Sequence, residues 1–141
     1  MMSPVTSIAV CLGEKYRCFA GRASRSEYWW FSLLAWLVCG YVLHTFPFRS
    51  LSATFCIVAV LAFAPPWLAA TARRLHDIDR SGWWQAPALL ILLLSILLLS
   101  RGGLLLALGA VLGLGVLLPA CWHLSRPGSR GTNRFGEEPL V

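Results

Sequence analysis

The residue types that could do chemistry gather in one short polar stretch at positions 73–84, which reads Arg-Arg-Leu-His-Asp-Ile-Asp-Arg-Ser-Gly-Trp-Trp. A histidine next to aspartates, here His76 beside Asp77, could serve as a general base or contribute to a metal site. With a serine such as Ser24 or Ser81, the pair could also complete a Ser–His–Asp arrangement for nucleophilic catalysis. The stretch is therefore the first candidate for a reacting centre.

None of these three kinds of site has a supporting pattern elsewhere in the sequence. A metal site usually takes about three or four ligands, and the other histidines, His44 and His123, fall at opposite predicted helix ends. The sequence contains no HExxH motif and no CxxC pair, and no strained nucleophile turn surrounds either serine. We therefore predict no metal site, no cofactor and no catalytic residue. A lipid-acting membrane enzyme that uses His76 and Asp77 stays open as an alternative.

A bonding network is a simpler role for the same residues. If the stretch continues a helix, Arg73 and Asp77 are four residues apart, as are His76 and Arg80, so each pair would face along one surface. Ion pairs would then tie the stretch to Glu27 and to arginines near the C-terminus. The sequence favours this interpretation over catalysis.

The elements that must position this stretch are long and apolar. The chain has 141 residues, of which 57% are hydrophobic and 13% charged, whereas soluble domains carry about 25% charged residues. Four apolar blocks, at residues 29–46, 51–70, 84–100 and 104–122, approach the roughly 20 residues that one membrane crossing needs. We therefore predict an all-α fold, an integral membrane bundle of four transmembrane helices that forms a single domain over residues 1–141.

Basic residues indicate the orientation of these spans. Only Arg49 and Arg101 fall on one side of the predicted membrane, opposite ten other basic residues. Because Lys and Arg accumulate in cytoplasmic segments, we expect both termini and the tail at 125–141 in the cytoplasm, beside a bacterial inner membrane. The positive-inside rule accounts for this charge, so no nucleic-acid partner is expected. The ten are Lys15, Arg17, Arg22, Arg25, Arg73, Arg74, Arg80, Arg126, Arg130 and Arg134.

Two helix starts precede the first span. Ser3-Pro4 is a favourable start for a short amphipathic helix at residues 1–20, lying in the membrane interface. Ser24 and Glu27 have the spacing of a capping box, in which each side chain bonds to the amide of the other residue. The apolar stripe expected on the interfacial helix consists of Ile8, Leu12, Tyr16 and Phe19.

Prolines and glycines mark the second and fourth spans. Pro65, Pro66 and Pro119 each free a carbonyl one turn earlier, which must find another partner within lipid. Two interpretations stay open: the prolines accommodate simple bends, or they splay the helices and leave a shallow pocket at headgroup depth. Gly109 and Gly113 form a GxxxG pattern, which fits packing within one chain as well as a dimer.

A small transporter or channel subunit is a further alternative. Proton-coupled carriers commonly place Asp, Glu, Lys or Arg inside their spans. None of these residue types lies inside the four predicted spans, and no inverted repeat is visible in the sequence. Both observations weigh against transport.

Three motifs resemble one known family. They are Phe19-Ala20-Gly21-Arg22-Ala23-Ser24-Arg25-Ser26-Glu27-Tyr28-Trp29, the polar stretch at 73–84, and Gly131-Thr132-Asn133-Arg134-Phe135-Gly136. Together they resemble the small bacterial inner-membrane family called domain of unknown function 805, over about residues 16–139. The resemblance implies a multi-helix inner-membrane protein and supplies no activity, catalytic residue or cofactor. Phe135 stands where the family usually has Tyr, and Asp79 where Gly is common.

We predict that the three motifs form one layer on the cytoplasmic face, in which Glu27 and Asp77 bond to arginines of other segments. The expected role is a non-enzymatic binding or assembly module. Its basic, Trp-rich face would engage membrane lipids with anionic headgroups, a partner protein or a second copy of the chain. The predicted cluster consists of Arg22, Ser24, Arg25, Glu27, Arg73, Arg74, His76, Asp77, Arg80, Trp83, Trp84, Asn133 and Arg134.

Overall fold

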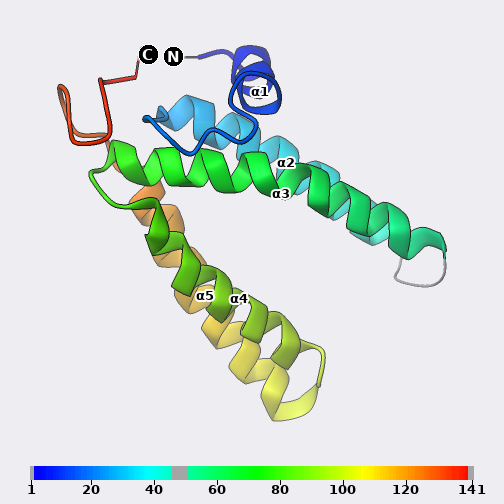
Figure 1. Ribbon diagram of the computed structural model, residues 1–141. Helices are drawn as coiled ribbons and strands as arrows, with labels where there is room; N and C mark the ends of the chain where they lie inside the picture. The colour runs from blue at the N-terminus through cyan, green and yellow to red at the C-terminus, as the bar shows by residue number, and fades with distance from the viewer. Residues whose placement is uncertain (1, 46–50, 140–141) are drawn as a thin grey trace.

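The computed structural model describes residues 2–45 and 51–139, and helices dominate this part of the chain (Figure 1). The prediction of an all-α fold is confirmed, since the described residues contain no strand beyond an isolated bridge between Asn133 and Gly136. The elements are α1 (Pro4–Leu12), α2 (Arg25–Thr45), α3 (Leu51–Asp77), a short 3-10 helix η1 (Gly82–Trp84), α4 (Gln85–Leu99) and α5 (Gly103–Ser125).

The four long helices pair as two hairpins rather than as one bundle. Helix α2 packs along α3, and α4 packs along α5. Figure 1 shows the two hairpins meeting at the end that carries α1 and the C-terminal tail, and diverging from there. The predicted single bundle is therefore not confirmed. The sequence pattern could not distinguish a single bundle from two hairpins, because a helix face that meets lipid is as apolar as one that meets another helix.

Two helical segments of the described residues are long and apolar enough to cross a membrane, 82–99 and Gly103–Ser125. Only 6% and 11% of their apolar windows are buried within the chain. A core helix of a soluble protein would be mostly buried, so this exposure favours a lipid environment. The link between the first two predicted spans at residues 47–50, which includes Arg49, and the side chain of His44 fall outside the part of the chain described.

Small residues explain the close packing of α4 against α5. A Cβ atom added at Gly109 would lie 2.8 Å from the Ser95 carbonyl oxygen and 2.9 Å from the Leu99 amide nitrogen. The buried Ser95 hydroxyl donates a 2.8 Å hydrogen bond to the Gly109 carbonyl, and Gly113 faces the same serine. The GxxxG pattern thus serves packing within the chain, one of the two interpretations left open by the sequence.

Helix α1 is shorter than the interfacial helix predicted at residues 1–20. It starts as expected, with the Ser3 hydroxyl accepting from the Thr6 amide and proline in the first turn. It ends at Leu12, because the Gly13 amide closes the last turn on the Ala9 carbonyl. The predicted apolar stripe is also wrong. Tyr16 and Phe19 lie beyond the helix, and the buried face is made by Ser7 and Cys11.

A backbone carbonyl that a proline in α3 leaves free accepts a hydrogen bond from another part of the chain. Pro66 has no amide hydrogen to donate to the Ala62 carbonyl one turn earlier. The Tyr16 hydroxyl, from the loop after α1, donates a 2.7 Å hydrogen bond to that carbonyl. The loop is therefore fastened to the helix at the proline kink.

Replacing Tyr16 by Phe should remove this hydrogen bond and lower the free energy of unfolding by about 1 kcal/mol. The matched control is Tyr41→Phe, because Tyr41 is exposed on α2. Thermal unfolding of both variants in the same detergent measures the effect. Equal midpoints for the two variants would show that the hydroxyl of Tyr16 contributes nothing.

Candidate functional site

A cluster of buried charges lies where the two hairpins meet. We call it the buried ion cluster and define it by five side chains, each at most 5% exposed: Arg22, Glu27, Arg73, Arg74 and Asp77. They come from the loop before α2, from the first turn of α2 and from the last turns of α3. Charges are buried in proteins when they are paired and hydrogen-bonded, so the cluster must satisfy its own groups.

Asp77, the last residue of α3, is the centre of one half of the cluster. Its Oδ1 atom accepts from Arg22 Nε at 2.9 Å, and its Oδ2 atom accepts from Arg74 Nη1. The Ser129 amide donates to the Asp77 carbonyl at 2.8 Å, which brings the C-terminal tail onto the same residue. Gly128 lies so close that an added Cβ would be 2.6 Å from the Asp77 Cγ atom.

Glu27 is the centre of the other half. It forms a 2.9 Å ion pair with Arg73 and a 3.7 Å pair with Lys15. The Ser24 hydroxyl accepts from the Glu27 amide at 3.2 Å, as the capping box predicts. The reciprocal bond is absent among the described contacts, because the Glu27 carboxylate turns to these cations instead.

The predicted pairing of Arg73 with Asp77 is wrong. Arg73 reaches Glu27 on α2, while Asp77 pairs with Arg74, three residues before it, and with Arg22. Bonds between segments replace the bonds expected along one helix, because a buried carboxylate gains more from several converging guanidinium donors. The broader expectation that Glu27 and Asp77 bond to arginines of other segments agrees with these contacts.

Backbone carbonyls satisfy most of the remaining guanidinium donors. Arg22 donates to the Gly131 carbonyl at 2.6 Å, and Arg74 Nε donates to the Leu124 carbonyl at 2.9 Å. Arg73 donates in the same way to the Cys18 carbonyl. Burial lowers the pKa of Arg74, and the Asp77 carboxylate opposes that shift. The three arginines thereby hold the N-terminal loop and the C-terminal tail against α3.

His76 is enclosed by the first and third motifs. Its Nδ1 atom lies 3.0 Å from the Gly21 carbonyl oxygen, and its ring stacks on Phe135 with centroids 3.9 Å apart and planes within 3°. Asn133 donates through its amide to the His76 carbonyl at 2.9 Å. No hydrogen bond joins His76 to a serine in the described residues. The histidine therefore acts here as a packing and bonding element.

Asp79 and Arg80 form the exposed edge of the motif. Asp79 has a φ of 57°, and it is the only described residue other than glycine with a positive φ. Glycine adopts this conformation at no steric cost, which gives a physical reason for glycine in related sequences. Asp79 pairs with Arg134 at 3.1 Å on the surface. Arg80 lies over the Trp84 ring at 5.4 Å, so the predicted pairing with His76 is wrong.

The predicted cluster residues thus divide into a buried and an exposed group. Ser24 is buried with the ion cluster, while His76 and Asn133 are half-buried beside it. Arg25, Arg80, Trp83, Trp84 and Arg134 are exposed. Lys15, Gly128 and Ser129 also belong to the arrangement and were not predicted. Their only sequence signal is proximity to a motif, and their role depends on loop paths that a sequence pattern does not encode.

Cys11 packs against the buried ion cluster, with its Sγ atom 3.9 Å from Glu27 Oε1. Desolvation and then the Glu27 charge raise the pKa of the Cys11 thiol to about 11, from an ordinary value of 9.0. Because the thiolate is the reactive form, Cys11 should resist iodoacetamide at pH 8 while exposed Cys18 is modified. Folding keeps Cys11 protonated, so its contribution to stability is complete below pH 9.0 and is lost as the pH rises through about 11.

Mass spectrometry of the labelled peptides measures both cysteines in one sample. Labelling after unfolding in denaturant supplies the control, in which the two should react alike. Equal labelling of Cys11 and Cys18 in the folded protein would contradict the described burial.

Comparison with known proteins places this arrangement in a family. The model of the family described as "Protein of unknown function (DUF805)" matches residues 16–137, which contain all three motifs. The Inner membrane protein YhaH of Escherichia coli K12 is 33% identical over 140 residues, covering 91% of this chain and 92% of the relative. The Inner membrane protein YhaI of the same organism is 32% identical over 127 residues, covering 89% of each. No solved structure matches the chain. The chain therefore belongs to the family of proteins of unknown function called DUF805.

Proposed function

We propose that this chain is an integral inner-membrane protein that crosses the bilayer four times, with both termini in the cytoplasm. The names of its relatives support the inner membrane. The two long apolar segments 82–99 and Gly103–Ser125 support two of the crossings. Helices α2 and α3 have comparable length and would supply the other two. The buried ion cluster then lies at the cytoplasmic membrane boundary.

We further propose a non-enzymatic role as a binding module for anionic lipid headgroups. The observation that carries this proposal is the use of Glu27 and Asp77 inside the chain, where they neutralise buried arginines. Exposed arginines on the same side are left without a carboxylate partner in the described structure: Arg17, Arg25, Arg80, Arg126 and Arg130. Exposed cations beside a bilayer attract acidic headgroups by about 1 kcal/mol each.

The buried arginines cannot themselves contact headgroups. Arg22, Arg73 and Arg74 were expected to supply charge to the surface, and their burial reassigns them to holding the layer together. A surface hollow of about 230 Å³ lies beside Arg25 and Arg130, next to the start of α2. Glu138 also lines the hollow, and its carboxylate accepts from the Gly131 amide. The exposed guanidinium groups of Arg25 and Arg130 suit a headgroup phosphate. This hollow is the proposed headgroup site.

Two observations make the alternatives less favourable. An enzyme centred on His76 and Asp77 would need those groups available to a substrate, whereas Asp77 is bonded to two arginines and His76 is stacked on Phe135. A carrier would need polar groups along a path between its spans. The surfaces of α4 and α5 away from the layer are formed chiefly by exposed leucines.

Gentle purification from native membranes, followed by mass spectrometry of retained lipids, tests the headgroup site. The wild type should retain phosphatidylglycerol or cardiolipin in excess over phosphatidylethanolamine, and the double variant Arg25→Ala, Arg130→Ala should retain less of this acidic lipid. Arg101→Ala is the charge-matched control, because Arg101 lies at the far end of α4 and α5. Retention of a single protein partner without acidic lipid would instead support an assembly module.

A further inference from the structure

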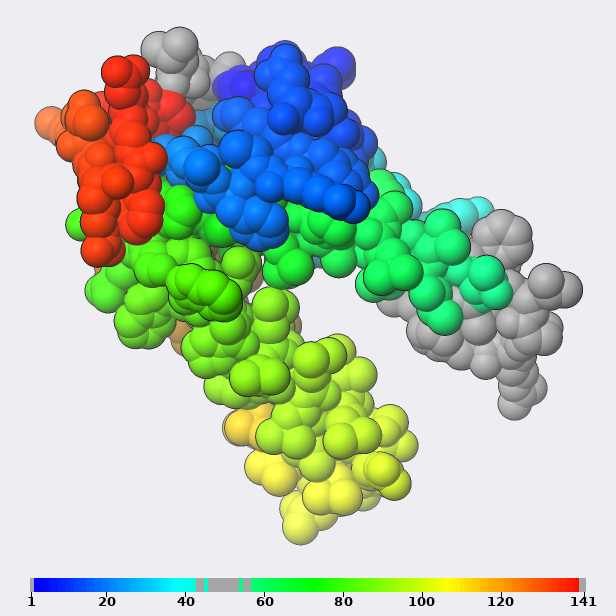
Figure 2. All heavy atoms as spheres, viewed as in Figure 1, coloured from blue at the N-terminus to red at the C-terminus, as the bar shows by residue number. Residues whose placement is uncertain are grey.

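A cavity separates the two hairpins just below their junction. It has a volume of about 380 Å³ and is lined by residues from all four long helices. This volume falls within the range of about 300–1,000 Å³ that is typical of small-molecule sites. Figure 2 shows the hairpins diverging beneath the junction, so the space between them opens to the surroundings of the spans. The sequence left a pocket near the prolines as one of two interpretations.

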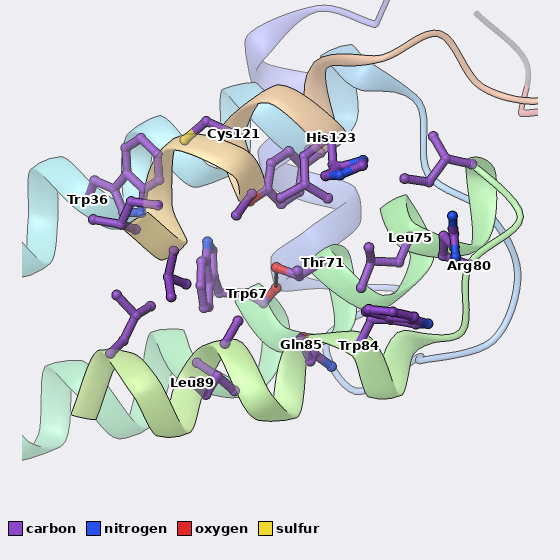
Figure 3. A pocket seen from close by; sticks show the side chains of 18 residues that line it. Trp36, Trp67, Thr71, Leu75, Arg80, Trp84, Gln85, Leu89, Cys121 and His123 are labelled. Atoms are coloured by element: carbon purple, nitrogen blue, oxygen red, sulfur yellow. Dashed lines mark hydrogen bonds between the residues drawn. The ribbon is translucent and has the colours of Figure 1, made fainter. Parts of the chain in front are cut away.

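The chemistry of the wall changes along the length of the cavity. Figure 3 shows Arg80 toward one end of the lining, His123 and Gln85 between the ends, and Trp67 and Leu89 toward the other. A polar end, a hydrogen-bonding middle and an apolar end match the order of groups in a glycerophospholipid. That order is a headgroup, a glycerol ester region and an acyl chain.

Two polar atoms of residues that line the cavity are buried without a partner. They are the Trp67 Nε1 donor and the Gln85 Oε1 acceptor. Buried polar atoms are nearly always hydrogen-bonded, because leaving one unpaired is unfavourable. A ligand that offers both an acceptor and a donor would satisfy them once the Trp67 and Gln85 side chains turn toward the cavity. An ester carbonyl can accept from the indole N–H, and a headgroup hydroxyl can donate to the amide oxygen.

The charge of the wall selects an anionic headgroup. No carboxylate lines the cavity, whereas Arg80 and His123 both do. Arg80 takes part in none of the ion pairs of the described residues, and its guanidinium lies over the Trp84 ring. This stacking holds the cation at the polar end of the cavity.

We propose that the cavity between the hairpins binds one acidic glycerophospholipid with a hydroxyl-bearing headgroup, its phosphate at Arg80 and one acyl chain against the apolar wall. The inference rests on the membrane placement proposed above. The cavity is a second lipid site, distinct from the headgroup hollow beside Arg25 and Arg130. The hairpins would then be joined by a bound lipid at the place where they share few protein contacts.

Lipid titration of the delipidated full-length protein, followed by native mass spectrometry, tests the cavity. The probes are dioleoyl phosphatidylglycerol, phosphatidylethanolamine and diacylglycerol. Arg80→Ala should weaken phosphatidylglycerol binding about tenfold, which corresponds to about 1.4 kcal/mol, because it removes a charged hydrogen bond to the phosphate. Ala120→Leu, which fills the cavity, should abolish binding of one phosphatidylglycerol. Arg101→Ala and Ala107→Leu, both outside the lining, should bind as the wild type does.

Each of the following outcomes would overturn the inference and would show which part of it is wrong. Equal binding of phosphatidylglycerol and diacylglycerol would remove the role of charge. Wild-type binding by Ala120→Leu, or by Ala88→Leu if the first variant does not fold, would place the lipid outside the cavity. If the double variant Arg25→Ala, Arg130→Ala lost phosphatidylglycerol binding and no cavity variant did, the lipid site in the cavity would be contradicted. The proposed headgroup site would then remain. Failure of all acidic lipids to bind would overturn both proposals.

Discussion

Replacing Asp77 by Asn should lower the free energy of unfolding by about 3–5 kcal/mol, because it leaves buried charges without their partner. Arg22 and Arg74 both bond to the Asp77 carboxylate, and their side chains are fully buried. Asn keeps the size of the side chain and removes its charge. The cost therefore comes from two uncompensated guanidinium groups and not from a cavity.

The matched control is Asp79→Asn, two residues later. Asp79 pairs with Arg134 on the surface, where both side chains are more than half exposed. Such pairs contribute about 0–1 kcal/mol, and Asn tolerates the positive φ at this position. Chemical unfolding of both variants in one detergent, followed by circular dichroism, provides the comparison. Equal stability of the two variants would contradict the structural role assigned to Asp77.

Replacing Gly109 by Ala should lower the free energy of unfolding by about 1–3 kcal/mol, the usual cost of overpacking. The added methyl would meet backbone atoms of Ser95 and Leu99 on α4, which cannot rotate away as a side chain can. The two helices must then separate along the interface that holds the second hairpin together. The Ser95 hydrogen bond to the Gly109 carbonyl would lengthen with them.

Gly115→Ala on the same helix is the control, and its expected effect has the opposite sign. Nothing lies within 4 Å of a Cβ atom added at Gly115, and alanine favours a helix over glycine by about 1 kcal/mol. Thermal unfolding in detergent, monitored by loss of the monodisperse peak in size-exclusion chromatography, ranks both variants. If Gly109→Ala were as stable as Gly115→Ala, close packing at Gly109 would be disproved.

The helices were largely predictable from the sequence, whereas their arrangement was not. Apolar blocks at 51–70 and 104–122 fall within α3 and α5, because runs of apolar residues of this length are a signal that a pattern can detect, although α3 continues to Asp77. The divergence of the hairpins was missed because it depends on which apolar faces meet each other. The end of α1 was missed because Gly13 terminates the helix before the apolar stripe ends.

The candidate site was predictable as a set of motifs and not as a set of bonds. If the four apolar blocks cross a membrane, most charged residues fall on one side and share a small layer, so Glu27 and Asp77 could be expected to bond to arginines of other segments. Which arginine each would bond could not be inferred. The answer depends on the tail, where Gly128 lets the chain pass against Asp77 and Ser129 bonds to its carbonyl.

We propose that the layer around Glu27 and Asp77 faces the cytoplasm, at one end of four spans. Single cysteines at Arg101 and Arg130, each in a variant with the native cysteines replaced, test it with a membrane-impermeant maleimide. In spheroplasts, the cysteine at 101 should be labelled and the cysteine at 130 should not. In inverted membrane vesicles, the pattern should reverse. Labelling of the cysteine at 130 in intact spheroplasts would contradict the account.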